Sequence, residues 1–346
     1  MDVQGTARKK LEQRLRTELP ELDKLRKKMV VRIGVVWGGI GLIFLSALLY
    51  LTYMAGRPVI REFQVTNDIV PVMQAIGVAI FFYLMAGLFL YKQKQRVVYR
   101  TLYNGEYANR YRKEVAMKAL PVMLDGLVFD AEKGIPVADF IESGFPFFGN
   151  PARYHSTGLI KGVTGHTSYV FSEVLAEELI QDGDAPAMYS ELFRGIFFMA
   201  DFQKDTQWNI LVYPDAVKYF SSVLLRNVGR KKKPSDSGYQ RIKLEDVKFE
   251  KYFEVYGEDQ VETRYILSPA LMSRITDFRE KSGKMLQLSF KGSKAYLAIH
   301  YPVGKVLLSP PLLKPVYDLR VLESYVSEIR MMIELIKELN LNSRLV

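Results

Sequence analysis

Two long stretches near the N-terminus contain no charged residue, and they constrain the fold more than any other feature. The first covers 33–56 and the second covers 69–91, with a short polar segment at 57–68 between them. A helix needs roughly 20 residues to cross the apolar core of a bilayer, which is about 30 Å thick. Soluble domains of this size rarely bury two such helices, apolar on every face. The pattern therefore predicts a transmembrane helical hairpin.

Basic residues flank the predicted spans on one side only. Residues 1–32 hold ten Lys and Arg against five Asp and Glu, and residues 92–118 hold eight against two. The segment 57–68 holds only Arg57 and Arg61 as basic residues. Because Lys and Arg are retained on the cytoplasmic side, we expect both termini to be cytoplasmic and 57–68 to be an outward loop. The basic residues nearest the spans are candidate contacts for lipid headgroups: Lys24, Arg26, Lys27, Lys28, Arg32, Lys92, Lys94 and Arg96.

The charge of the remaining chain is balanced. The formal net charge is +10, but residues 119–346 contain 28 basic and 29 acidic side chains, so the excess lies beside the predicted spans. A nucleic-acid-binding domain carries a basic face, and this balance argues against that class of partner. The chain has no cysteine, and its three histidines, His155, His166 and His300, lack the spacing of metal ligands. We therefore expect no metal site and no cofactor.

Both flanks of the hairpin are predicted to be helical. Residues 1–32 form a basic cytoplasmic segment in which Pro20 begins a second helix, because proline fits the first helical turn. A leucine stripe there has three candidate roles, which are packing on the C-terminal domain, self-association and contact with the lipid surface: Leu11, Leu15, Leu19, Leu22 and Leu25. A juxtamembrane helix over 92–119 places four tyrosines on one face, where packing is favoured over an aromatic platform: Tyr99, Tyr103, Tyr107 and Tyr111.

Residues 120–346 alternate between strand-like and helical patterns, which is typical of an α+β domain of antiparallel strands with packed helices. Three hairpins are predicted, from 158–163 with 167–174, from 193–202 with 208–213, and from 285–291 with 294–300. Further strands are expected at 239–244, 252–256 and 261–267. Helices are expected over 215–229, over 268–281 with Ser268 and Pro269 at the start, and from Asp318 onward.

The C-terminal helix carries a single apolar stripe. Its apolar residues follow a 3-4-3-4-3 spacing, which places them on one face: Leu319, Leu322, Val326, Ile329, Ile333 and Ile336. An exposed stripe of this length would promote aggregation in the cytoplasm. We therefore expect the stripe to be buried, mostly against strands of the same domain.

No catalytic motif is found in the C-terminal domain. His166 lies in a glycine-containing turn between two predicted strands, but the Walker spacing is absent and a plain hairpin turn is the favoured interpretation. A run of carboxylates is interleaved with lysines and is interpreted as solvated strand and turn faces: Glu245, Asp246, Glu250, Glu254, Glu258, Asp259 and Glu262. The basic cluster at 230–233, within the 226–238 loop, is interpreted as a solvated segment, with lipid or phosphate binding as the alternative.

Several segments resemble one known family. They are Phe171-Ser172-Glu173-Val174, the run from Phe193 to Phe202, Leu244-Glu245-Asp246 and, above all, the run from Phe249 to Leu267. Together they resemble a bacterial family of two-helix membrane proteins whose C-terminal cytoplasmic domain is catalogued only as a domain of unknown function. The resemblance covers roughly 150–345, with Thr263 where the family pattern predicts alanine. It implies the bacterial inner membrane, and it transfers no catalytic residue.

These patterns favour a membrane-anchored binding or scaffolding protein that is not an enzyme. Its expected partners are the lipid bilayer and a membrane or cytoplasmic protein, and a homo-oligomer remains an option. The alternative is a membrane-associated enzyme that uses carboxylates or His166 on a lipid-linked or cytoplasmic substrate. A pocket lined by converging polar groups would favour the enzyme, whereas an exposed apolar surface would favour the binding protein.

Overall fold

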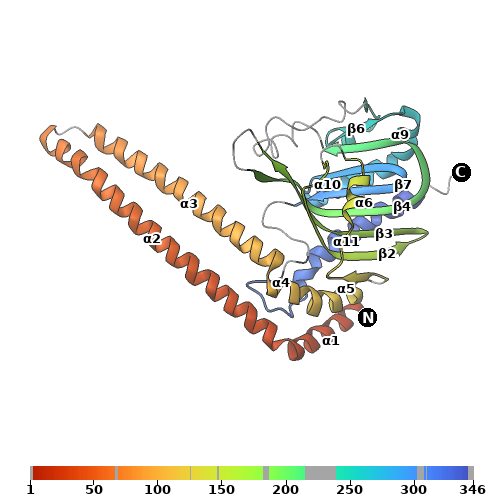
Figure 1. Ribbon diagram of the computed structural model, residues 1–346, viewed down its shortest axis with the longest axis horizontal. Coiled ribbons are helices and arrows are strands. Elements are labelled where there is room, and N and C mark those ends of the chain that lie inside the picture. The colour runs from red at the N-terminus through yellow and green to blue at the C-terminus, as the bar shows by residue number, and fades with distance from the viewer. Residues whose placement is uncertain are drawn as a thin grey trace.

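The N-terminal part of the chain is a pair of long helices joined to a sheet domain (Figure 1). A computed structural model describes residues 3–66, 69–124, 126–145, 148–181, 187–214, 239–301, 308 and 310–341. Helix α1 spans Val3–Glu18, α2 spans Pro20–Thr66 and α3 spans Val70–Asn104. As predicted, Pro20 is the first residue of α2, where a missing amide proton costs nothing. The fold of the described chain is α+β.

The outward loop expected at 57–68 is helical as far as Thr66, because α2 continues through Pro58. Arg57 and Arg61 end the apolar run, and the loop was expected to begin there. Charged residues do not end a helix by themselves, however, because its backbone hydrogen bonds can continue beyond them. The two helices run antiparallel, and the hydroxyls of Thr52 and Tyr83 lie 3.2 Å apart.

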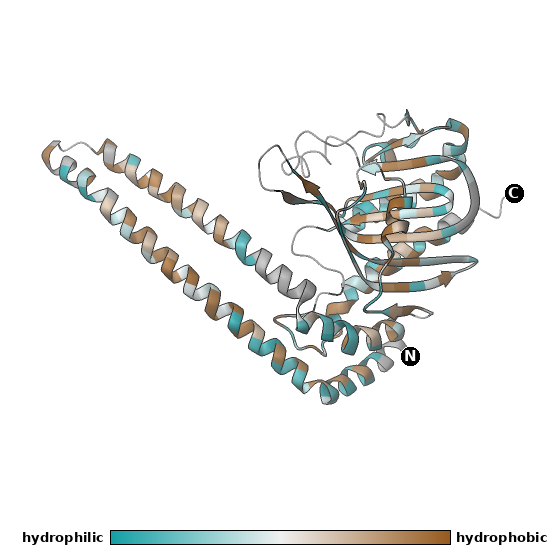
Figure 2. Cartoon of the chain, in the orientation of Figure 1, coloured by the Kyte–Doolittle hydropathy of each residue, from teal (hydrophilic) through white to brown (hydrophobic). Residues whose placement is uncertain are grey.

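Both long helices have the length and apolar character needed to cross a membrane. The qualifying segments are Pro20–Val59 and Val72–Lys94, and their most apolar windows are not buried within the structure. Figure 2 shows hydrophobic residues distributed around both helices. Their side chains therefore lack a protein covering among the described residues, as expected of surfaces that face lipid.

The predicted helix over 92–119 is interrupted rather than continuous. Helix α3 ends at Asn104, and Gly105 adopts an extended conformation as the N-cap of α4 (Glu106–Tyr111). A π-helical turn, η1 (Arg112–Ala116), follows, and α5 (Met117–Met123) completes the segment. The chain thus turns at Gly105 from the long hairpin onto the domain. Periodicity alone did not reveal the turn, because one glycine is tolerated within a helical pattern.

One antiparallel sheet organises the domain. Its strand elements in the described chain are β1 (Val128–Asp130), β2 (Arg153–Thr164), β3 (Thr167–Ile180), β4 (Met188–Pro214), β5 (Gln240–Ile242), β6 (Phe253–Gly257) and β7 (Leu286–His300). Strands β2 and β3 pair from Arg153–Glu177 to Thr164–Thr167, which confirms the first predicted hairpin. Gly165 closes it with φ +61°, a left-handed conformation that glycine adopts without strain.

Strand β7 turns back on itself at Gly292. A strand of 15 residues, if fully extended, would separate its ends by roughly 50 Å. Instead, the His300 amide donates a 2.9 Å hydrogen bond to the carbonyl of Met285, just before the strand. Gly292 supplies the turn with φ +57°. The two halves of β7 therefore lie side by side, which confirms the hairpin predicted from 285–291 and 294–300.

Strand β4 bends around the β7 hairpin. Its first half pairs with the second half of β7, placing Gly195 opposite His300, and its second half places Val212 opposite Leu288. Strands β3 and β6 pair with the two halves of β4. The predicted pairing of 193–202 with 208–213 is therefore wrong, because β7 lies between these arms (Figure 1). Alternation of apolar residues defines the buried face of a strand, but it does not identify the strand's partner.

Caps define the short helices that follow the sheet's outer strand. The predicted strand at 261–267 is instead helix α9 (Gln260–Ile266), whose N-cap Asp259 accepts a hydrogen bond from the Glu262 amide. Helix α10 (Pro269–Ser282) has the predicted N-cap, Ser268, and ends at Gly283 with φ +64°. Helix α8 (Val247–Glu250) is capped by Asp246. The predicted helix at 215–229 and the 226–238 loop lie outside the described residues.

Helices cover both faces of the sheet. One face packs against α10 and α11 (Arg320–Leu341), together with α1, α4 and α5, in the larger core. The other face packs against α6 (Val137–Glu142) and the segment after it, through stacked Phe140 and Phe148. The apolar stripe of α11 is buried as predicted, except that Ile333 is only partly buried.

Candidate functional site at the base of the hairpin

The acidic run over 245–262 does not form a catalytic cluster, because most of its carboxylates hold backbone amides. Asp246 and Asp259 cap α8 and α9. Glu250 accepts a 2.7 Å hydrogen bond from the Leu244 amide, and Glu262 accepts from two consecutive amides of β4, at 3.0 and 2.9 Å. Glu254 instead pairs with Arg241 on the neighbouring strand, at 3.1 Å, and the side chains of Glu245 and Glu258 are exposed. Most of these carboxylates therefore stabilise local structure.

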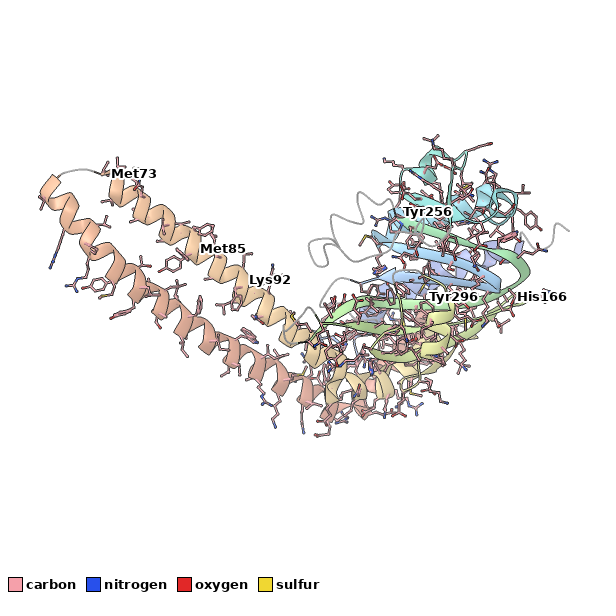
Figure 3. The ribbon with its side chains drawn as sticks, turned by 45° about the horizontal axis from the view of Figure 1, so that its top comes forward. Met73, Met85, Lys92, His166, Tyr256 and Tyr296 are labelled. Carbon is pink, nitrogen blue, oxygen red and sulfur yellow. The ribbon has the colours of Figure 1, made fainter. Side chains whose placement is uncertain are left out.

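The histidines are dispersed over the sheet. His166 is exposed in the turn between β2 and β3, at the end of the domain away from the long helices (Figure 3). The ring of His300 contacts the Gln287 amide at 3.1 Å and packs edge-on against Phe193. Within the described ranges, no group of three or more His, Asp or Glu residues could hold a metal ion.

A group of long-range polar contacts lies where the long helices meet the domain. Arg26 of α2 is buried and donates hydrogen bonds to Asp23, at 2.8 Å, and to the carbonyl of Leu312, at 2.7 Å. On α4, the Tyr107 hydroxyl donates a 2.5 Å hydrogen bond to the carbonyl of Pro311. The segment 310–316 therefore binds both α2 and α4 at the base of the hairpin.

Asp23 of α2 also binds the segment 310–316, at its C-terminal end. Its carboxylate accepts a hydrogen bond from the Val316 amide at 3.4 Å and pairs with Lys27 at 3.3 Å. The side chain of Asp23 is only 13% exposed, so it is a buried acceptor that needs the Arg26 guanidinium beside it. Both ends of 310–316 are thus tied to α2.

The predicted headgroup contacts divide into three groups. Arg26 departs from the prediction, because its guanidinium is buried against the domain. Lys24 and Lys27 are exposed and pair with carboxylates of their own helix. The remaining described members are exposed on α2 and α3, namely Lys28, Arg32, Lys92 and Lys94, with Lys92 labelled in Figure 3. The side chain of Arg96 lies outside the described residues.

The leucine stripe of the N-terminal segment packs on the chain's own domain. Leu15, Leu19 and Leu22 are buried in the larger core, and Leu11 and Leu25 pack against its edge. Of the three roles considered, this arrangement supports the first. The tyrosine stripe behaves in the same way, since Tyr107 and Tyr111 are buried; the side chains of Tyr99 and Tyr103 lie outside the described residues.

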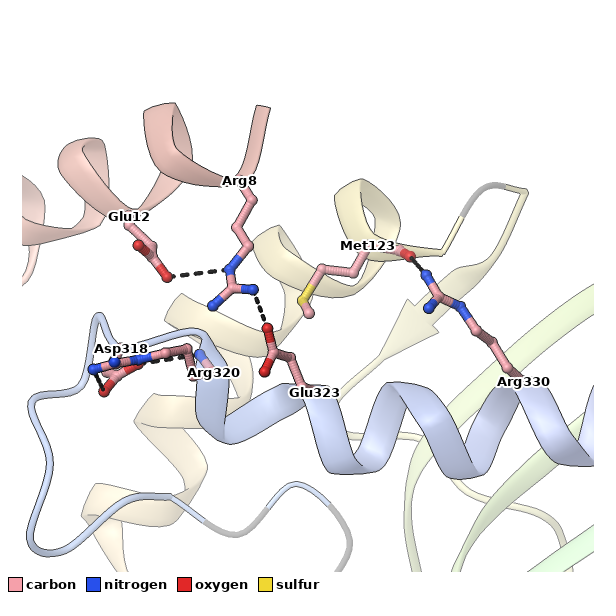
Figure 4. Close-up of polar contacts among 7 residues, drawn as sticks. All are labelled: Arg8, Glu12, Met123, Asp318, Arg320, Glu323 and Arg330. Atoms are coloured by element: carbon pink, nitrogen blue, oxygen red, sulfur yellow. Dashed lines mark hydrogen bonds and ion pairs between the residues drawn. The ribbon is translucent and has the colours of Figure 1, made fainter. Parts of the chain in front are cut away.

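Ion pairs connect the N-terminal helix to the C-terminal helix (Figure 4). Arg8 of α1 pairs with Glu12 at 3.3 Å and with Glu323 of α11. Arg330 of α11 donates a 3.1 Å hydrogen bond to the carbonyl of Met123, at the end of α5. Each of these exposed contacts contributes little to stability. Together they connect α11 to α1 and to α5.

Polar side chains are buried on η1 and on the sheet, and further contacts connect the sheet region to α11. Arg112 of η1 and Glu173 of β3 are both buried. Tyr301 donates a 2.7 Å hydrogen bond to Glu328 of α11, and Lys284 pairs with the same carboxylate. Burial and the nearby carboxylates of Glu328 and Glu173 raise the pKa of Tyr301 well above its usual value. The hydroxyl therefore remains a hydrogen-bond donor at physiological pH.

His155 belongs to the same region. Burial and, secondarily, the positive charge of Arg112 lower the pKa of His155 below its ordinary value of 6.5, so the imidazole stays neutral at pH 7. Catalytic motifs do not reveal these buried polar groups. The signal in the sequence is an isolated charge inside an apolar strand, as with Glu173, because such charges are buried only with partners.

A protein-family model described as "Protein of unknown function (DUF3137)" matches 191–341. Residues 191–341 carry a DUF3137 domain. The DUF3137 domain begins within β4 and includes α8 to α11, whereas the long helices and β1 to β3 precede it. Its last helix, α11, carries the contacts to α1 and α5 described above.

No curated protein matches the chain. Among solved structures, the crystal structure of the mycobacterial trehalose monomycolate transport factor A, TtfA, is similar with a TM-score of 0.34 and 8% sequence identity. That similarity covers 69% of this chain and 96% of the other. At this level of similarity it does not determine the function of the DUF3137 domain.

Proposed function

We propose that the chain is a scaffold anchored in the bacterial inner membrane, which holds its DUF3137 domain in a fixed position at the cytoplasmic surface to bind a partner protein. The basic flanks at 1–32 and 92–118 support the cytoplasmic placement. The length and apolar character of α2 and α3 support the anchoring. The resemblance of the chain to two-helix membrane proteins points in the same direction.

One observation carries this proposal: α2 passes without interruption from the core of the domain into the apolar span. Leu22 is fully buried in the domain core, and the charge-free run begins at Ile33 on the same helix. Ile33 follows Leu22 by eleven positions on this helix, which corresponds to a rise of roughly 16 Å. A flexible linker would let the domain diffuse around its anchor. A continuous helix with buried contacts fixes its height and orientation instead.

Rigid attachment suits a protein that positions a partner relative to the membrane. Fixing both molecules in orientation reduces the entropy lost on binding, because fewer arrangements have to be eliminated. The alternative of an enzyme has weaker support. Asp246, Glu250, Asp259 and Glu262 each accept hydrogen bonds from backbone amides, and His166 lies in an exposed turn.

The test is photo-crosslinking in intact cells, with a photoreactive residue at exposed apolar positions of the domain. Suitable positions are Trp208, Val247, Val261 and Tyr265, and Val163 serves as a comparison outside the DUF3137 domain. We expect a discrete adduct with a membrane or cytoplasmic protein from at least one position. A chain with flexible Gly-Ser insertions after Met29 and at Gly105 should remain in the membrane but give less of that adduct. Absence of any adduct would refute binding, and an unchanged yield would refute rigid presentation.

A further inference from the structure

The segment 310–316 lies close to the level at which α2 reaches the membrane. Arg26, which binds the carbonyl of Leu312, precedes Ile33 and the charge-free run by seven residues. At the rise of an α-helix this separation is about 10 Å. The headgroup layer on each side of a bilayer adds roughly 5–7 Å to the hydrocarbon core. If α2 crosses the membrane as proposed, the Arg26–Leu312 contact lies about 3–5 Å outside the headgroup layer, a distance that an outward leucine side chain can span.

This segment presents one leucine outward. Leu313 is 89% exposed, and the neighbouring Lys314 is also exposed. A single exposed leucine is ordinary on a protein surface. Leu313, however, is held in place, because the carbonyls of Pro311 and Leu312 are hydrogen-bonded to α4 and α2. Three prolines in 310–315 further restrict the backbone.

The surroundings of Leu313 match the charge of an anionic membrane. Residues 20–32 of α2 contain five basic and two acidic side chains, a surplus of three. Lys27, Lys28 and Arg32 are exposed on this stretch, and Lys314 adds a further cation beside the leucine. Lys and Arg near the membrane surface attract anionic headgroups. An exposed apolar side chain beside a cation and a basic helix stretch is the combination with which interfacial segments bind membranes.

We propose that 310–316 is a third membrane contact of this chain, in addition to the two helices, and that it takes an anionic phospholipid surface. Leu313 enters the headgroup layer, and Lys314 pairs with lipid phosphate. Because Arg26 and Tyr107 hold the segment, this contact prevents the domain from tilting on its helical base. The inference rests on the proposed membrane anchoring.

The absence of cysteine allows a direct test with single-cysteine variants of the full chain. Leu313→Cys is labelled with an environment-sensitive fluorophore, and the protein is placed in nanodiscs that contain phosphatidylglycerol and headgroup-quencher lipids. Leu45→Cys in the apolar span, with chain-quencher lipids, reports anchoring. Val261→Cys on α9, which is 78% exposed at the far end of the domain, is the matched control.

The label at 313 should shift to shorter wavelength and be quenched by the lipid, whereas the label at 261 should do neither. Quenching at 313 should fall when Lys314→Glu is added or when phosphatidylglycerol is replaced by zwitterionic lipid. Quenching at 45 without quenching at 313 would overturn this inference and leave the anchoring intact. A lack of quenching at 45 would instead overturn the anchoring. Quenching at 313 that is indifferent to lipid charge and to Lys314→Glu would overturn the electrostatic part of the inference.

Discussion

The Arg26 guanidinium donates a 2.7 Å hydrogen bond to the carbonyl of Leu312, 286 residues further along the chain. Arg26 lies on the helix that continues into the apolar span, and Leu312 lies in the segment that leads into α11. This buried arginine connects two regions, and nothing in their sequences predicts that they lie in contact. The stability of this connection decides whether the domain and its anchor behave as one body.

Arg26→Ala should therefore destabilise the folded chain by about 1–3 kcal/mol, because it removes the donor of the Leu312 carbonyl and leaves Asp23 with only Lys27 and the Val316 amide. Chemical denaturation in detergent, followed by far-ultraviolet circular dichroism, measures the change. Lys24→Ala removes an exposed pair with Glu21 on the same helix, at 2.8 Å, and should cost less than about 0.5 kcal/mol. Equal effects of the two variants would mean that Arg26 does not hold the base of the hairpin.

Ile329→Asp should cost about 4 kcal/mol or more, because Ile329 is fully buried beneath α11 and the new carboxylate has no partner there. Ser327→Asp is the matched control, since it places the same charge at an exposed position of the same helix. Thermal unfolding of both full-length variants gives the comparison. An unchanged midpoint for Ile329→Asp would show that the apolar stripe is not part of the core.

Stability should fall as the pH is lowered through 6.5, partly because of His155. Burial and Arg112 lower its pKa in the folded state, so the unfolded chain binds more protons between pH 6.5 and the folded pKa. The contribution is fully present above pH 6.5 and is lost below it. His155→Gln should weaken this dependence between pH 7 and 5. Parallel pH series of denaturation curves for this variant and the unsubstituted chain test the difference.

Asp259→Ala should destabilise the domain by about 1 kcal/mol, because it removes the N-cap of α9. Asp259→Asn should restore most of that stability, since an amide oxygen also accepts the hydrogen bond from the Glu262 amide. The yield of the crosslinked adduct should fall in Asp259→Ala and recover in Asp259→Asn, in parallel with the stability of each variant. A loss of cellular function in Asp259→Asn, with stability and crosslinking unchanged, would favour a chemical role for the carboxylate.

The orientation of the hairpin is tested with a reporter that is active only outside the cytoplasm. Fused after Val346 it should be inactive, and inserted between α2 and α3 at 67–68 it should be active. This follows from the surplus of Lys and Arg at 1–32 and 92–118. An active C-terminal fusion would place the domain on the opposite side and would contradict the proposed function.

Features with local causes were predictable from the sequence. The two apolar helices follow from runs without charge. Helix α10 follows from Ser268 at its start and Gly283 after its end, and the β7 hairpin follows from a turn at Gly292 between two apolar runs. Helix α9, where a strand was expected at 261–267, also has a local signal, because Asp259 followed by Glu262 is a helix-capping pattern.

Only the tertiary structure shows which distant segments of the chain pack against each other. The arms of β4 are separated by β7, and Arg26 is buried by a segment 286 residues away. Alternation and periodicity record which face of an element is apolar, and they carry no information about which distant element covers that face. A charge such as Arg26 looks the same in sequence whether it faces headgroups or a buried carbonyl. Its burial is decided by loop 310–316, whose position depends on the packing of the whole domain.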